Sequence, residues 1–211
     1  MHTWQSLIRN FKATQGLRLE PWLTAMYEIY KDLQSEVAQA GAYVSLGECL
    51  KTGCTTSNDL WYPHPAGVEG LVEAEILVAR ELGIRFHPIR SYHSLPSAIV
   101  PEEMVETKEQ ILEDTEKLVK RYHDPDELSM CRVGIGPSIA QYDAEEVLRS
   151  TIEFAEKYDV MVHGHLAESK SEYDFTMEQF GCSPVEWFRR NNLLGDRFYY
   201  AHCIHLDEQD I

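Results

Sequence analysis

Strand-like and helix-like segments alternate along this chain from Gly53 onward, and this alternation limits the folds that it can adopt. Short apolar or β-branched segments are each followed by a longer amphipathic segment, a spacing typical of βαβ units. Such units place their strands in parallel in one sheet. The first part of the chain is predicted to be helical instead, after a loop that begins at His2. The predicted strands cover residues 54–60, 84–89, 130–135, 160–165 and 198–203, and the predicted helices cover residues 21–39, 41–50, 68–82, 108–122, 143–158 and 170–191.

The composition indicates one globular domain with an acidic surface. The chain has 211 residues, of which 44% are hydrophobic and 26% are charged, so it is long enough to bury a sizeable core. Asp and Glu number 35 against 19 Lys and Arg, and the resulting net charge of −16 repels phosphate groups. Nucleic acids and anionic membranes are therefore not expected as partners.

The cysteines and the hydropathy pattern predict a cytoplasmic protein. The five cysteines are widely spaced and form no Cys-x-x-Cys pair, which supports neither a disulfide framework nor a zinc ribbon. The sequence shows no secretion signal and no apolar run of roughly 18 residues. No glycine-rich dinucleotide fingerprint follows a predicted strand, and Pro137 directly after Gly134-x-Gly136 argues against a phosphate cradle.

The segment from Val160 to Glu168 combines a buried strand with side chains suited to metal chemistry. Because side chains alternate along a strand, His163 and His165 share one face, and Glu168 follows just beyond the strand end. Imidazole nitrogens bind divalent metals, and a nearby carboxylate can move protons. Another predicted strand ends at His202, about one βα unit later. Histidines at two strand ends predict an enzyme with its site at the open end of a parallel barrel.

Four motifs follow one another along the chain: His2-Thr3-Trp4-Gln5-Ser6-Leu7-Ile8-Arg9, Gly53-Cys54-Thr55-Thr56, His163-Gly164-His165-Leu166-Ala167-Glu168 and Ala201-His202-Cys203. In this order they resemble the amidohydrolase superfamily over essentially the whole chain. The similarity is to the branch of metal-dependent cytosine/guanine-type deaminases and triazine hydrolases, and within it to the 8-oxoguanine deaminases. Members of this branch are (β/α)8 barrels that carry one divalent metal, usually zinc, at the carboxyl ends of the strands.

The resemblance implies an α/β fold, namely a partial (β/α)8 TIM-type barrel that runs from the end of strand 1 through strand 6. Residues 1–211 are expected to form a single catalytic amidohydrolase barrel domain that lacks strand 1 proper and strands 7 and 8. The barrel would therefore not be closed by this chain alone. The first member of a His-x-His pair and an aspartate after strand 8, both metal ligands in the family, are expected outside this chain.

The resemblance also implies roles for individual residues. His2 resembles the second member of the His-x-His pair after strand 1, and His165 resembles the metal ligand after strand 5. Glu168 matches the proton-transferring acid, and His202 matches the strand 6 histidine that assists carbonyl or leaving-group chemistry. The implied cofactor is one divalent metal, with Zn²⁺ first and Fe²⁺ as an alternative. A disordered chain end remains the alternative for His2, and a structural role inside the barrel is favoured for His163.

Five further residues are candidates for substrate contacts. Gln5 follows the first motif and can hydrogen-bond a base edge, although solvent exposure is an equal alternative. Trp61 and Tyr62 come just after a predicted strand, where an aromatic ring can stack on a planar ligand, with core packing as the alternative. Arg90 and Tyr92 follow the next strand, in a segment that departs from the 8-oxoguanine deaminase pattern. The remaining histidines are interpreted as surface or core residues.

The predicted function is metal-dependent hydrolytic deamination of a purine-like heterocycle with release of ammonia. An 8-oxoguanine deaminase-like activity is the first choice, and a triazine (hydroxyatrazine-like) aminohydrolase or an isoxanthopterin deaminase are the alternatives. The expected partner is a small heterocyclic substrate, and the complete enzyme is expected to be a homo-oligomer. Two other classes stay open: a catalytically incomplete fragment that acts only by association with a complementary chain, and a small-molecule binding module without the metal.

Overall fold

Five parallel strands form one sheet in the order in which they occur along the chain. The computed structural model describes residues 1–211. Neighbouring strands are hydrogen-bonded from the first to the fifth without a crossover, which confirms the predicted α/β fold built from βαβ units. The fifth strand is bonded to the fourth alone, so the sheet is open, as predicted for a partial barrel. The strands are β1 (Thr56–Trp61), β2 (Arg85–Tyr92), β3 (Gly134–Pro137), β4 (Val162–Leu166) and β5 (Phe198–His202).

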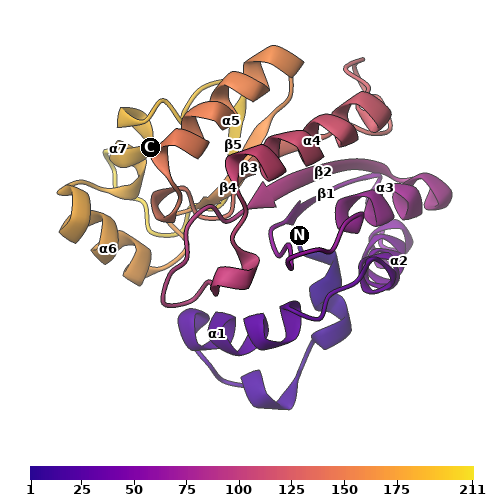
Figure 1. The fold of residues 1–211 in the computed structure, drawn as a ribbon, viewed down its shortest axis with the longest axis horizontal. Coiled ribbons are helices and arrows are strands. Elements are labelled where there is room, and N and C mark those ends of the chain that lie inside the picture. The colour runs from indigo at the N-terminus through magenta and orange to yellow at the C-terminus, as the bar shows by residue number, and fades with distance from the viewer.

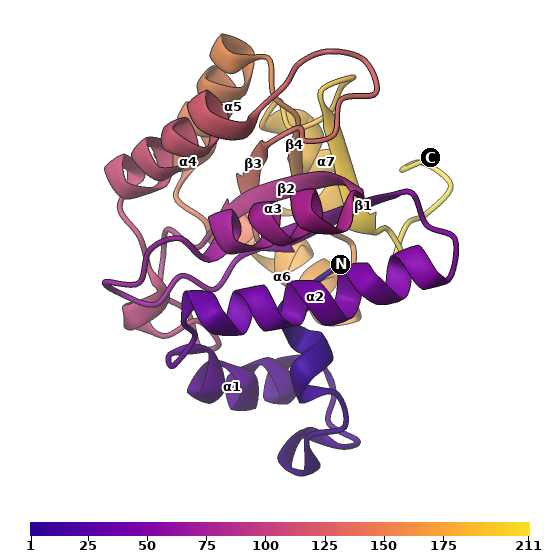
Figure 2. The same ribbon diagram turned by 90° about the vertical axis from the view of Figure 1, so that its right-hand side faces the viewer.

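The α-helices are α1 (Leu19–Tyr30), α2 (Ser35–Lys51), α3 (Leu71–Leu82), α4 (Lys108–Tyr122), α5 (Glu145–Tyr158), α6 (Lys170–Phe180) and α7 (Pro184–Arg190). Helices α3, α4 and α5 lie along one face of the curved sheet, and α6 and α7 continue this layer beyond β4 (Figure 1). Helix α2 runs beside α3, and α1 lies below it, away from the layer of α4 and α5 (Figure 2). None of the helices is both long and apolar enough to cross a membrane.

The first two residues run beside β1 in the manner of a further parallel strand. The Met1 amino group donates to the Asn58 carbonyl oxygen at 3.1 Å, and the Leu60 N–H donates to the Met1 carbonyl oxygen at 3.2 Å. A short 3-10 helix, Thr3–Ile8, begins directly afterwards. His2 is therefore held at the carboxyl end of the sheet, next to the end of β1, and the alternative of a disordered histidine is not what the structure shows.

The boundary between the first two helices differs from the sequence prediction. The sequence predicted a break at residue 40, between helices over residues 21–39 and 41–50. The structure instead places the break at residues 31–34 and keeps Gly41 inside α2. A Cβ atom at Gly41 would lie 2.7 Å from the Cα of Trp4. The glycine therefore serves close packing of α2 against the N-terminal segment.

Strand β3 is shorter than predicted and shifted along the chain. The prediction covered residues 130–135, whereas β3 begins at Gly134, and Cys131 forms only an isolated bridge with Phe86. A Cβ atom at Gly136 would lie 1.9 Å from the carbonyl oxygen of His163 in β4. Glycine at this position lets the two strand backbones approach each other, which is a packing role rather than phosphate binding.

Asp143, the first residue of the helix predicted over residues 143–158, lies outside α5 and instead holds the segment that follows β2. The N-cap residue of α5 is Ala144. Oδ1 of Asp143 accepts hydrogen bonds from the Ser94 backbone N–H at 2.6 Å and from the Ser94 hydroxyl at 2.7 Å. The other oxygen, Oδ2, is buried and has no partner. Burial raises the pKa of Asp143 to about 7, although the bonds from Ser94 act in the opposite direction.

The raised pKa of Asp143 predicts a pH-dependent stability difference for Asp143→Asn. Between the unfolded pKa of about 3.9 and the folded value, the native state binds the extra proton, so its stability falls as pH rises. The asparagine variant lacks this loss, because its amide stays neutral. We expect its melting temperature relative to the native chain to increase by roughly 5–10 °C from pH 5 to pH 8. Thermal unfolding at both pH values measures this difference; a Glu127→Gln control at an exposed position is expected to show little change, and an equal shift for Asp143→Asn at both pH values would refute the assignment.

Candidate active site

A cavity of about 190 Å³ opens at the carboxyl ends of the strands, where parallel barrels place their active sites. Its walls come from the N-terminal segment, from α1, from residues 93–100 after β2, from residues 138–142 after β3, and from the ends of β4 and β5. Six of the residues predicted to form the site line this one cavity, namely His2, Gln5, Tyr62, His165, Glu168 and His202.

His2 and His165 face each other through one nitrogen each. Nδ1 of His2 donates to the Leu60 carbonyl oxygen at 2.9 Å, and Nδ1 of His165 donates to the Ser138 carbonyl oxygen at 2.8 Å. A carbonyl oxygen can only accept, so each Nδ1 carries the proton and each Nε2 carries a lone pair. The two Nε2 atoms are 3.3 Å apart.

This pair of nitrogens fits a zinc-type metal. Two nitrogens bound to one tetrahedral zinc at ~2.0–2.1 Å lie roughly 3.3–3.4 Å from each other, which is the separation observed for His2 and His165. Burial lowers the pKa of His165 to about 3, and burial followed by the charge of His165 lowers the pKa of His2 well below its usual value. Both imidazoles are therefore neutral, as metal ligation requires. No group of three or more metal-binding side chains forms in this chain, so its contribution is this pair.

Glu168 and His202 form a second pair beside His165. Nε2 of His202 lies 3.3 Å from Oε1 of Glu168, and the rings of His165 and His202 are stacked with centroids 5.2 Å apart. Burial, followed by the charges of Glu172 and Glu20, raises the pKa of Glu168 to about 7. Burial lowers the pKa of His202, although Glu172 opposes this shift. Both pKa shifts favour the neutral forms of the two side chains, so near neutral pH this contact is not a fixed ion pair.

Glu172, which the sequence did not single out, shapes the backbone that carries Glu168. Its buried carboxylate accepts from the backbone N–H groups of Ala167 at 2.9 Å and Glu168 at 2.8 Å, and from Nε2 of Gln141 at 2.6 Å. Ala167 has a φ of 51°, in the left-handed region that costs energy for a residue other than glycine. The spacing Ser169-x-x-Glu172 before a helix is a capping-box signal that could have identified this residue.

Gln5 and Tyr62 lie at the cavity, whereas Trp61 does not. Nε2 of Gln5 is 3.2 Å from the hydroxyl of Tyr30 and 3.4 Å from that of Tyr62. The ring of Tyr62 stands edge-on to His2, with centroids 5.1 Å apart. Trp61 is fully buried against Trp4, and its indole N–H donates to the Pro63 carbonyl oxygen. Core packing, the alternative considered for the aromatic pair, therefore describes Trp61.

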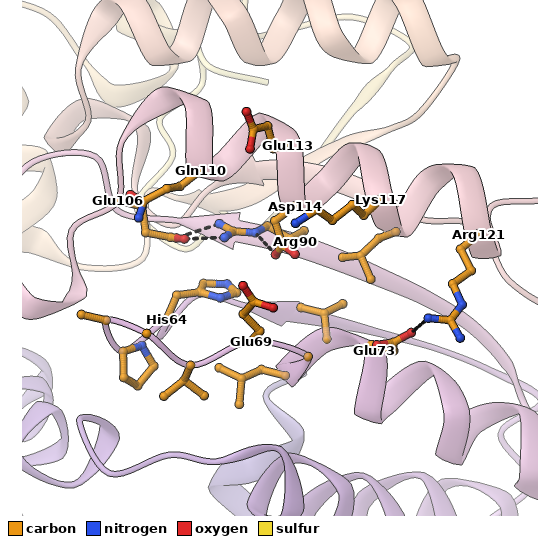
Figure 3. Close-up of a pocket in the computed structure, with 18 of the residues that line it drawn as sticks. His64, Glu69, Glu73, Arg90, Glu106, Gln110, Glu113, Asp114, Lys117 and Arg121 are labelled. Carbon is orange, nitrogen blue, oxygen red and sulfur yellow. Dashed lines mark hydrogen bonds and ion pairs between the residues drawn. The ribbon is translucent and has the colours of Figure 1, made fainter.

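Arg90 and Tyr92 are placed away from this cavity, which corrects the expectation that they contact substrate. Arg90 lines a separate cavity of about 620 Å³ between α3 and α4, where its guanidinium bonds to Glu106 and Asp114 (Figure 3). Tyr92 is fully buried, with its hydroxyl 2.7 Å from that of Thr151. The reason is the two-residue period of β2, which directs both side chains to the helix-covered face.

His93 is the residue of this region that reaches the cavity, and sequence reasoning missed it. It follows β2 and has the opposite parity to Arg90 and Tyr92. Its Nε2 lies 2.7 Å from the hydroxyl of Tyr27, which comes from α1 and also lines the cavity. The alternation of side chains along β2 could have identified His93, because it places His93 on the opposite face from Arg90 and Tyr92. Nothing in the sequence indicated that α1 would lie over the strand ends and bring Tyr27 there.

His163 takes the structural place that the sequence favoured for it. Its ring stacks on Tyr199 with centroids 4.0 Å apart, and Nδ1 donates to the Tyr199 carbonyl oxygen at 2.8 Å. Tyr199 in turn bonds through its hydroxyl to Nδ1 of His87 at 2.9 Å. None of these three residues lines the cavity, so His163 supports the sheet below the site rather than the site itself.

Comparisons with known proteins agree with the family resemblance that the sequence motifs indicated. The chain is 32% identical over 213 aligned residues to the 8-oxoguanine deaminase of Pseudomonas aeruginosa, covering 100% of this chain and 47% of that protein. It is 30% identical over 216 aligned residues to a hydroxydechloroatrazine ethylaminohydrolase of a Pseudomonas species, covering 100% of this chain and 44% of that protein. The chain thus spans about half the length of the curated relatives that it matches.

A solved structure shows the same fold. The crystal structure of an atrazine chlorohydrolase from Arthrobacter aurescens, in complex with zinc, matches with a TM-score of 0.89 at 24% identity. The match covers 100% of this chain and 48% of that one, which supports a partial barrel. Residues 1–211 also match, from end to end, the family described as the amidohydrolase family. This chain belongs to the amidohydrolase family.

Proposed function

We propose that this chain forms part of a metal-dependent hydrolase that deaminates a purine-like heterocycle and releases ammonia. The observation that carries the proposal is the convergence of two pairs in one cavity. The neutral imidazoles of His2 and His165 face each other at 3.3 Å, and Glu168 contacts His202 at 3.3 Å beside them. These side chains come from the N-terminal segment, the end of β4 and the end of β5, so their meeting reflects the fold and not sequence proximity.

The metal and the acid have separate tasks in this reaction. His2 and His165 would hold a divalent metal, which when bound would lower the pKa of a water molecule and so make a nucleophile available at neutral pH. Glu168 can both accept and deliver a proton near pH 7, because its pKa is raised to about 7. His202 keeps the Glu168 carboxyl oriented through their contact. From the same position it can hydrogen-bond the reacting centre of the substrate.

The cavity suits a small planar heterocycle. Its volume of about 190 Å³ lies below the ~300–1,000 Å³ of pockets for drug-sized ligands. Aromatic rings of Trp22, Tyr27 and Tyr62 provide flat surfaces, and the Gln5 amide offers both a donor and an acceptor. We propose 8-oxoguanine as the first candidate substrate, which agrees with the relative of that name. Isoxanthopterin and hydroxytriazines are the other candidates.

The direct test is an ammonia-release screen on the full natural polypeptide, loaded with zinc. We expect release from 8-oxoguanine or one of the two other heterocycle classes, loss of this activity with a chelator, and its return when zinc is added. His165→Ala is expected to remove both bound zinc and activity, whereas His205→Ala, at an exposed position, is expected to retain both. Zinc-loaded protein that releases no ammonia from any of these compounds would refute the proposed reaction.

The open edge of the sheet favours a second candidate of another class. Strand β5 is only partly buried, whereas β4 is buried along its whole length, and β5 has no strand neighbour other than β4. An unpaired parallel edge presents free backbone N–H and carbonyl groups that can pair with another strand. In this alternative the chain by itself is inactive and works only in association with complementary strands.

A further inference from the structure

Thr3, the residue after His2, is held by two buried acids from separate elements. The Thr3 backbone N–H donates to Oδ2 of Asp59 in β1 at 2.5 Å, and the Thr3 hydroxyl donates to Oε1 of Glu75 in α3. All three residues are completely buried. Acidic side chains are rarely buried to this degree, so their presence here calls for a specific role.

The burial of both acids and their unsatisfied oxygens favour one proton held between them. Burial raises the pKa of Asp59 to about 6, and burial followed by the charge of Asp59 raises the pKa of Glu75 well above its usual value. Oδ1 of Asp59 and Oε2 of Glu75 are buried and have no hydrogen-bond partner. A proton on Glu75 that is donated to Asp59 satisfies both of these atoms. The other two oxygens are then free to accept from Thr3.

The remaining polar atom of Thr3 is also fixed. Its carbonyl oxygen accepts from the hydroxyl of Ser6 at 2.7 Å and from the hydroxyl of Ser45 in α2 at 3.0 Å. Thr3 is thereby tied to β1, α2 and α3 at once. His2 has a single side-chain hydrogen bond apart from its contact with His165, the one to the Leu60 carbonyl oxygen. The position of its ring therefore depends on how firmly the neighbouring backbone is held.

We propose that Asp59 and Glu75 are positioning residues, which act through Thr3 to hold Nε2 of His2 opposite Nε2 of His165 and thereby set the metal affinity of the site. The inference rests on the metal role proposed above for the two histidines. A metal site needs its ligands within about 0.5 Å of the productive geometry. A ligand carried by an irregular segment is placed less precisely than one on a strand or helix, unless neighbouring contacts hold its backbone. The acid pair supplies such contacts for the segment that carries His2.

The test compares Thr3→Val with two variants that keep the bonding pattern. Valine keeps the shape of threonine but leaves Oε1 of Glu75 without a donor. Thr3→Ser keeps the hydroxyl, and Glu75→Gln replaces the shared proton by an amide N–H. We expect Thr3→Val to weaken zinc binding by roughly 10–100-fold, the range for residues that orient metal ligands. The two conservative variants are expected to stay within about three-fold of the native protein. Competition with a chromophoric chelator measures the affinity of the full natural polypeptide.

A readout on the metal-free protein tests the positioning itself. We expect backbone hydrogen exchange in residues 1–8 to be faster in Thr3→Val than in Thr3→Ser, with exchange in the rest of the chain unchanged. If Thr3→Val lowers thermal stability but leaves both zinc affinity and this local exchange unchanged, the pair is merely structural and the inference is overturned. The variant His165→Ala distinguishes failure of the metal site from failure of the positioning role. Unchanged zinc affinity in His165→Ala defeats the metal site itself, whereas lost affinity there with native affinity in Thr3→Val defeats only the positioning role.

Discussion

Glu168→Gln is expected to lower kcat by roughly 10²–10⁴-fold, the contribution typical of a general acid–base group, while zinc binding is retained. Glutamine has nearly the same shape as the glutamate and preserves a hydrogen-bonding oxygen, so the cavity keeps its form. It cannot take up and release a proton, which is the task that the raised pKa of Glu168 equips it for. Glu168 is not one of the two facing imidazoles, so the metal content is expected to stay at the native level.

Steady-state kinetics on the substrate found in the ammonia screen, together with elemental analysis for zinc, measure this effect. Glu178→Gln is a matched control on the neighbouring helix α6, at an exposed position outside the cavity, and is expected to have native kcat. A Glu168→Gln variant with a near-native rate, or one that has lost its zinc, would show that Glu168 has another role.

The order and type of the elements beyond residue 53 followed from the sequence because local signals and tertiary packing agree there. Helix α4 has the predicted bounds, Lys108–Tyr122, and it begins with a capping box between Thr107 and Gln110. The first fifty residues were harder, because their boundaries depend on packing rather than on local preference. Gly41 lies inside α2, where the absence of a side chain makes room for the backbone of Trp4, and no pattern within the helix reports this contact.

The residues of the candidate site likewise divide into those that the sequence could predict and those that depend on long-range packing. His165, Glu168 and His202 were predicted because strand ends in a parallel sheet meet at one edge, which the sequence order alone establishes. Tyr27 lies beyond such reasoning, since it reaches the cavity from α1, a helix whose position depends on long-range contacts. The prediction that Arg90 contacts the substrate was wrong for a different reason. The strand was predicted to end at residue 89, with Arg90 and Tyr92 in the segment after it, whereas β2 continues to Tyr92. Both residues therefore follow the side-chain alternation of the strand and point to the helix-covered face.

Arg90 points away from the active-site cavity, so the second large expected effect, that of replacing Arg90, is on stability rather than on catalysis. Arg90 is almost completely buried, and its guanidinium donates to both carboxylate oxygens of Glu106, to Asp114 and to the Ser91 carbonyl oxygen. The side chain of Glu106 is only 12% exposed, so without Arg90 it becomes a buried charge with no partner. Removing one member of a buried ion pair typically costs about 3–5 kcal/mol.

Arg90→Met is therefore expected to lower the free energy of unfolding by about 3–5 kcal/mol. Adding Glu106→Gln is expected to recover part of this loss, because the double variant no longer buries an unpaired carboxylate. Arg121→Met is the matched control: Arg121 pairs with Glu73 at the rim of the same cavity, its side chain is 69% exposed, and the expected loss is at most ~1 kcal/mol. Denaturant unfolding measures all three variants. At a temperature where Arg90→Met is folded, its KM is expected to be native, since Arg90 does not line the cavity that holds His165. A raised KM with native stability would instead indicate that Arg90 contacts the substrate.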